Sequence, residues 1–138
     1  GPTEATIRVS PEGVMYCLQR RDGVPSNTAL LGISRKLPYD QWEWKDLGQY
    51  LGGPNFIQIP DGRWIACGRL KDRGPDKKTK TVVCELDVDK GELRPLLDLP
   101  SGGDSSYPGL VWHQGLLWVS YYSSHEGKTA IYLARVKL

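Results

Sequence analysis

The chain has 138 residues, of which 39% are hydrophobic and 25% charged, a composition typical of one globular domain with a sizeable core. Eighteen basic and sixteen acidic side chains leave a net charge of +2, which predicts neither a nucleic-acid partner nor a membrane partner. Three cysteines, an odd count with no short spacing, argue against a disulfide framework and against a zinc site.

Short runs rich in Val, Ile, Tyr and Trp follow one another along the chain and are bounded by Gly, Pro and Asp. In chain order they cover residues 6–9, 14–19, 29–34, 42–47, 56–59, 64–68, 81–87, 93–99, 110–112, 116–121 and 130–136. No segment keeps a 3.6-residue apolar period, and ten prolines and sixteen glycines disfavour long helices. The sequence therefore predicts an all-β fold. Cys17 and Cys67 lie inside apolar runs and are expected to be buried.

One hairpin pattern recurs three times, with turn glycines at Gly13, Gly62 and Gly115, in steps of 49 and 53 residues. The first two repeats carry four strands each, and the third carries three. Four-stranded units that repeat every ~40–50 residues are typical of β-propeller blades. We expect three blades, at about residues 3–50, 51–100 and 101–138. Gly1-Pro2 has the form of a remnant that a protease leaves when a purification tag is removed. The natural N-terminus is then not visible, so the sequence leaves the localisation of the protein open.

Three blades are too few for a closed ring, because propellers usually have ~4–8 blades. The third blade also lacks its outermost strand. The chain thus has the form of the C-terminal half of a six-bladed propeller, with blade faces and strand edges exposed. We expect it to pair with itself as a homodimer or with a complementary N-terminal half-propeller.

The register of the repeat brings certain polar residues to equivalent positions. Arg20, Arg69 and Tyr122 each stand seven residues after a turn glycine. Glu4, Gly53 and Ser106 are predicted to share a second position, with Tyr107 one residue later. Two guanidinium groups near the centre of a propeller suit a carboxylate, as on an acidic glycan. The alternative is that the two arginines simply end surface strands.

These residues give the chain a resemblance to the C-terminal half of the sialidase (neuraminidase) superfamily, especially its bacterial BNR-repeat propellers. Glu4 is followed sixteen residues later by Arg20, and Arg69 closes the next hairpin. A Ser-Tyr pair at Tyr107 then precedes Glu126 by nineteen residues. The resemblance spans nearly the whole chain.

The resemblance implies roles for these residues. Tyr107 would be the nucleophile and Glu4 its base, because sialidases use a tyrosine where most glycosidases use a carboxylate. Arg20 and Arg69 would bind the substrate carboxylate, and Glu126 would orient a third arginine. That third arginine and the aspartate general acid belong to the N-terminal half of the family, so the chain would carry an incomplete site. No cofactor and no metal are implied.

Other interpretations remain open at the level of sequence. Asp104, in a Gly- and Ser-rich segment, is either a binding or acid residue or a turn cap. His125 is either a base or, more simply, a polar loop residue. The basic stretch at residues 71–80 contains Gly and Pro and is expected to be a solvated loop. An arabinanase-type glycosidase would work through Asp104 and Glu126, and a non-catalytic, self-assembling half-propeller needs none of these residues.

Overall fold

The computed structural model describes residues 1–23 and 25–138, and these residues form eleven strands and no helix. The strands are β1 (Pro2–Val9), β2 (Met15–Arg21), β3 (Leu30–Ser34), β4 (Glu43–Asp46), β5 (Gly52–Gln58), β6 (Trp64–Arg73), β7 (Lys78–Asp87), β8 (Glu92–Asp98), β9 (Ser106–His113), β10 (Leu116–Ser123) and β11 (Ala130–Val136). The predicted all-β fold is confirmed. Within this described part of the chain, nothing helical is long and apolar enough to cross a membrane.

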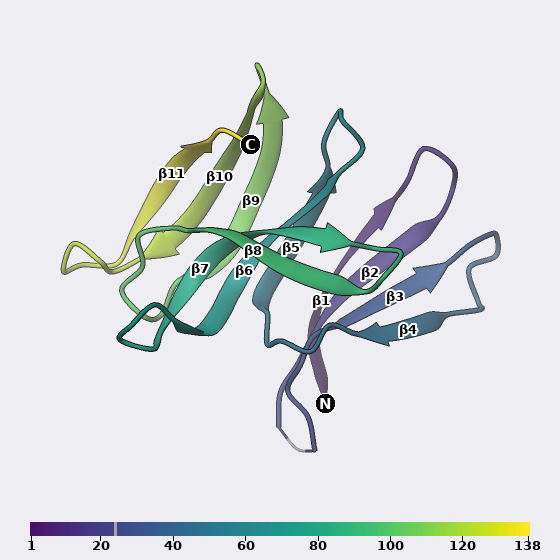
Figure 1. The fold of residues 1–138 in the computed structure, drawn as a ribbon, viewed down its shortest axis with the longest axis horizontal. Helices are drawn as coiled ribbons and strands as arrows, with labels where there is room; N and C mark the ends of the chain where they lie inside the picture. The colour runs from purple at the N-terminus through teal and green to yellow at the C-terminus, as the bar shows by residue number, and fades with distance from the viewer. Residues whose placement is uncertain (24) are drawn as a thin grey trace.

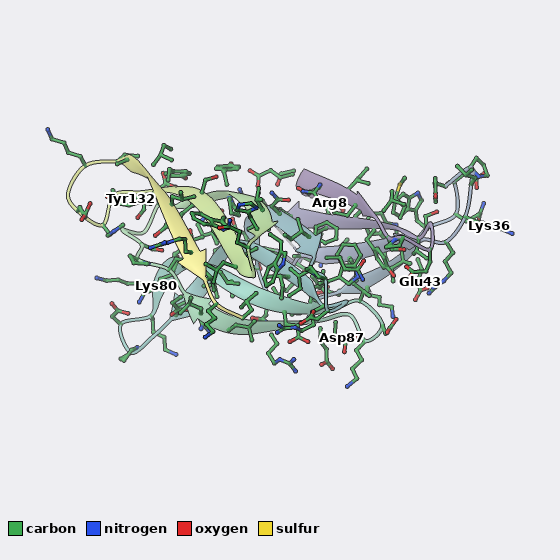
Figure 2. The ribbon with its side chains drawn as sticks, turned by 90° about the horizontal axis from the view of Figure 1, so that it is seen from above. Arg8, Lys36, Glu43, Lys80, Asp87 and Tyr132 are labelled. Atoms are coloured by element: carbon green, nitrogen blue, oxygen red, sulfur yellow. The ribbon has the colours of Figure 1, made fainter. Side chains whose placement is uncertain are left out.

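The strands form three antiparallel sheets in which neighbours in sequence are neighbours in space. Their orders are β1-β2-β3-β4, β5-β6-β7-β8 and β11-β10-β9. Figure 1 shows the sheets following one another, from the purple and blue β1–β4 to the green and yellow β9–β11. The view in Figure 2 places Lys36 near one end of this array and Tyr132 near the other. The sheets have the form of propeller blades, and the array that they make is open.

Two apolar cores lie between the three sheets, and β6 contributes to both. Trp64 and Ala66 belong to the core shared with the first sheet, while Ile65 and Cys67 belong to the core shared with the third. Successive side chains of a strand point to opposite faces, so a strand covered on both sides needs an unbroken apolar run. This explains why the central sheet has the most continuous hydrophobic sequence. Cys17, Cys67 and Cys84 are all buried and free, as expected for the first two.

Hydrogen bonds between the innermost strands repeat from one blade to the next. Thr6 Oγ1 of β1 donates to the carbonyl of Pro54 at 2.8 Å, and Asn55 Nδ2 of β5 donates to the carbonyl of Pro108 at 2.8 Å. Ser106, fully buried, donates through Oγ to the carbonyl of Gly52 at 2.7 Å. These bonds hold the starts of β1, β5 and β9 side by side and so position the residues discussed next.

The strand register confirms one predicted equivalence and corrects another. Arg20 pairs with Glu4 and Tyr122 pairs with Ser106, as the repeat predicts. Arg69, however, pairs with Gly52 and not with Gly53. The reason is a bulge between Gly52 and Asn55, which makes Gly53 an extra residue in β5.

The basic stretch at residues 71–80 is mostly exposed, as its Gly and Pro predict, but it is a strand hairpin around a short turn and not a loop. Its two ends extend β6 and β7, with Arg73 paired to Lys78 around a short turn. The hairpin therefore projects beyond the sheet and carries its lysines with it.

Candidate functional site

The Glu4 carboxylate joins all three sheets. Its Oε1 accepts hydrogen bonds from Tyr107 Oη of β9 at 2.6 Å and from Arg20 Nη1 of β2 at 3.0 Å. Its Oε2 accepts the backbone N–H of Gly53 in β5 at 2.8 Å. The structure thus brings together three of the predicted site residues, Glu4, Arg20 and Tyr107, from strands far apart in the chain.

This arrangement separates the pKa values of the two acidic groups. Partial burial would raise the pKa of Glu4, but the hydrogen bonds from Tyr107, Gly53 and Arg20 outweigh it and lower the pKa. The pKa of Tyr107 is raised, chiefly because its O–H donates to the Glu4 carboxylate. The nearby guanidinium groups of Arg20 and Arg69 oppose that rise. At neutral pH the proton therefore lies on the phenol and the negative charge on Glu4.

Tyr107 has an unusual backbone conformation, with a φ of 51° in the left-handed region. The residue at the matching bulge in β5 is Gly53, with a φ of 56°. Glycine adopts this region freely, whereas a residue with a Cβ is strained there by roughly 1–2 kcal/mol. A tyrosine kept at such a position is a feature typical of functional sites.

Arg69 lies beside this cluster and is covered by Asp104. Arg69 Nη1 contacts Asp104 Oδ1 at 2.8 Å, and Tyr122 Oη donates to the same oxygen at 2.6 Å. The rings of Tyr107 and Tyr122 stack with their centroids 6.0 Å apart, which connects the two clusters. The Asp104 side chain is 78% exposed, whereas that of Arg69 is mostly buried. Among the described residues, the buried Arg69 Nε has no hydrogen-bond partner.

An open cavity of about 650 Å³ lies next to the two arginines. Its lining has four basic residues, Arg20, Arg69, Lys71 and Lys78, together with Tyr50, Thr79, Asp104 and residues 101–103. Tyr50 forms an aromatic wall, with Arg20 Cζ 5.4 Å and Lys71 Nζ 4.1 Å from its ring centroid. Glu4 and Tyr107 are outside the lining, and Arg20, which is hydrogen-bonded to Glu4, connects them to the cavity. The lining has four cationic side chains and one carboxylate, which favours an anionic ligand. Outside the lining, Arg20 is paired with Glu4 and Asp22, and Lys78 with Asp76.

Sequence reasoning missed Tyr50, Lys71 and Lys78. The two lysines were assigned to a solvated loop, and only the extension of the β6–β7 hairpin brings them to the cavity. Tyr50 precedes β5 and is not one of the residues that the three-fold repeat brings to equivalent positions. Tyr122 was found by the register, but its bond to Asp104 was not.

Glu126 and His125 lie in the β10–β11 connection. Glu126 Oε2 accepts a hydrogen bond from Tyr132 Oη of β11 at 2.9 Å. The His125 ring packs on Tyr132 with centroids 4.3 Å apart, and its Nδ1 is 2.9 Å from Ser123 Oγ. In the part of the chain that the structure describes, no group of three or more His, Cys, Asp or Glu side chains is arranged to hold a metal.

The fold is similar to parts of larger solved structures. All of the chain matches 38% of a protein of unknown function from Dyadobacter fermentans DSM 18053, with a TM-score of 0.77 and 19% identity. All of it also matches 18% of a bifunctional GH43-CE protein from Bacteroides eggerthii, with a TM-score of 0.65 and 14% identity. No protein-family model and no curated protein matches the chain. At such identities the likeness shows a shared propeller-type fold, and the chain spans less than two fifths of either solved protein.

Proposed function

We propose that the chain provides a binding site for an acidic glycan, with Tyr107 and Glu4 as the reactive pair of a sialidase-like glycoside hydrolase. The observation that carries this proposal is the 2.6 Å hydrogen bond from Tyr107 to the Glu4 carboxylate, which Arg20 also holds. The fold shared with a GH43-CE protein is compatible with chemistry on glycans.

Arg20 and Arg69 would bind the carboxylate of the sugar. In this structure Asp104 forms an ion pair with Arg69. The Asp104 side chain is highly exposed and follows two glycines, Gly102 and Gly103. A ligand carboxylate would take its place on the Arg69 guanidinium. Lys71 and Lys78 add positive charge at the mouth of the cavity.

In the reaction step, Tyr107 Oη attacks the anomeric carbon while its proton moves to Glu4. The bond to the leaving group breaks, and water later releases the sugar from the tyrosine. A neutral phenol avoids the repulsion that a carboxylate nucleophile would meet from an acidic sugar. An aryl glycoside is the substrate of choice for testing this step, because its leaving group departs without a proton from the protein.

The test is hydrolysis of a fluorogenic aryl sialoside by the wild-type chain. Tyr107→Phe should lower the rate by at least ~10²-fold, because it removes the nucleophile and leaves the ring in place. Binding of the sugar acid, measured by calorimetry, should survive in this variant and be lost in Arg69→Gln. Tyr39→Phe is the matched control, because the Tyr39 phenol lies in the β3–β4 connection and donates only to the carbonyl of Gly13 at 2.8 Å. Turnover that is unchanged in Tyr107→Phe would contradict the proposal, and an absence of both binding and turnover would favour a non-catalytic module.

The likeness to the GH43-CE protein also favours a second candidate, a glycosidase of arabinanase type that uses carboxylates. Its residues would be Asp104 and Glu126. They have separate partners here, since Asp104 contacts Arg69 and Tyr122 while Glu126 contacts Tyr132. Turnover that survives Tyr107→Phe and is lost in Asp104→Asn would support this candidate.

A further inference from the structure

Lys71 lines the cavity because of its place in β6. It comes two residues after Arg69, and side chains two residues apart in a strand lie on the same face. Leu70, between them, faces the other way and is buried in the core shared with the first sheet. Lys71 Nζ lies 4.1 Å from the centroid of the Tyr50 ring, which forms a wall of the cavity. The ammonium group of Lys71 is therefore held beside Arg69 by an aromatic side chain.

A bulge in β6 separates Lys71 from the acidic residue that follows it. The strand pairing shifts between Leu70 and Arg73, so Lys71 and Asp72 together oppose Thr79. Asp72 adopts a left-handed backbone conformation, with a φ of 56°. Lys71 and Thr79 belong to the cavity lining, and Asp72 does not. The bulge thus leaves the lysine at the cavity without the neighbouring carboxylate.

The other cationic side chains of the lining already have acidic partners in the chain. Their ion pairs are Arg20–Glu4 at 3.0 Å, Arg20–Asp22 at 2.9 Å, Arg69–Asp104 at 2.8 Å and Lys78–Asp76 at 3.5 Å. Among the residues that the structure describes, Lys71 forms no such pair, and its close contact is with the Tyr50 ring. An anion can approach Lys71 without displacing a carboxylate of the protein, which is not true of Arg69.

We infer that the ligand of this cavity carries a second anionic group, a carboxylate or a sulfate on the sugar next to the acidic one, and that Lys71 binds it. The inference deepens the proposed function and rests on it, since Arg69 is the residue that would bind the first carboxylate. Arg69 and Lys71 are two residues apart in one strand, so about 7 Å separates their Cα atoms and one ligand can reach both. The cavity of about 650 Å³ is large enough for a ligand of more than one ring.

Two ligands that differ by one charge test the inference. The first is a dimer of sialic acid, with two carboxylates, and the second is sialic acid joined to galactose, with one. Calorimetry in about 0.01 M salt should give a Kd that is about 2- to 5-fold lower for the dimer, which is the effect of one exposed ion pair. A second pair of ligands, sialyl-N-acetyllactosamine with and without a sulfate on its glucosamine, distinguishes a sulfate site from a carboxylate site.

Substitutions at Lys71 locate the second group. Lys71→Met should make the two Kd values of a pair equal, whereas Lys71→Arg, which keeps the charge, should preserve the difference. Lys77→Met is the matched control, because it removes the same charge from the exposed turn of the same hairpin, outside the cavity lining. The difference in the wild type should also shrink in about 1 M salt, since salt screens exposed charges. The salt dependence needs no variant, so it tests the inference even if Lys71→Met fails to fold.

The outcomes separate this inference from the proposed function. Equal Kd values within both pairs for the wild type would overturn the inference alone, because both ligands would still bind. A difference that persists in Lys71→Met, or that is lost equally in Lys77→Met, would overturn it as well, because the second group would then lie elsewhere or respond only to net charge. Binding of none of these ligands would contradict the proposed function and the inference together.

Discussion

At the scale of single residues, Glu4 is the point at which the three sheets meet. It receives a phenol, a guanidinium and a backbone N–H from three different strands. The sequence register predicted that Glu4, Arg20 and Tyr107 would gather, because equivalent positions of a repeat lie at the same end of each blade. It could not predict the bond from Gly53, which depends on the bulge in β5. The partners of Asp104 and Glu126 depend on loops, for which a strand register has no rule.

The opposite pKa shifts of Glu4 and Tyr107 predict a pH dependence of stability. The pKa of Glu4 is lowered from 4.5, so its contribution is present above pH 4.5 and is lost as the pH falls through the folded-state pKa. The pKa of Tyr107 is raised from 10.0, so its contribution is complete below pH 10 and is lost as the pH rises through the folded-state pKa.

Urea unfolding of the wild type and of Tyr107→Phe across pH isolates this pair from other titrating groups. The difference between the two proteins should be largest at neutral pH and should shrink at both extremes. A difference that stays constant from acid to alkaline pH would show that the hydrogen bond does not couple the two groups.

At the scale of elements, all eleven strands were predicted, because alternation and turn residues are local signals. The boundaries were less predictable. The sequence places β6 at residues 64–68, yet the strand continues to Arg73, because pairing with β7 extends it through charged residues that have no apolar pattern. The same extension brings Lys71 and Lys78 to the cavity, so the error in the strand and the error in the site have one cause.

The joint between the second and third sheets should be sensitive to Gly53. A Cβ at this position would lie 2.6 Å from Ser106 Oγ and 3.0 Å from the backbone nitrogen of Tyr107, at a φ of +56°. Gly53→Ala should therefore lower the free energy of unfolding by about 2–4 kcal/mol, from overpacking and backbone strain together. Gly48→Ala is the matched control, because Gly48 has a φ of +68° and open space around its Cβ position.

The control should cost about 1 kcal/mol, from backbone strain alone. Chemical denaturation of the two variants measures the difference. Equal costs for Gly53→Ala and Gly48→Ala would mean that the sheets separate easily enough to make room for a methyl group.

At the scale of the whole molecule, the three sheets are unequal. The central sheet is covered on both faces, whereas each end sheet is covered on one. Burial reflects this difference: the first five residues of β6 are all buried, whereas exposed and half-buried residues alternate along most of β1 and β11. What the sequence could not reveal is which face of each end sheet is covered, because that depends on how the sheets pack on one another.

Hydrogen exchange should be slowest in the central sheet, which is covered on both faces, and faster in the two end sheets. Amides of β6 and β7 should exchange at least ~10²-fold more slowly than those of β4 and β11, which are the outermost strands of the two end sheets. Mass spectrometry of peptic fragments measures this order. Uniform exchange across the three sheets would contradict it and would indicate that the array opens only as a unit.

Because Asp104 forms an ion pair with Arg69, the chain itself supplies a carboxylate that competes with an acidic ligand for this arginine. A carboxylate tethered by a short loop acts at an effective concentration of the order of millimolar, without any ligand being added. A small acid that offers only a carboxylate must outcompete this intramolecular group and gains little by doing so. A sugar acid that also contacts Tyr50 or the lysines gains enough to displace it. In the proposed site, Asp104 would thus favour acidic ligands that have further groups to contact the protein, besides their carboxylate.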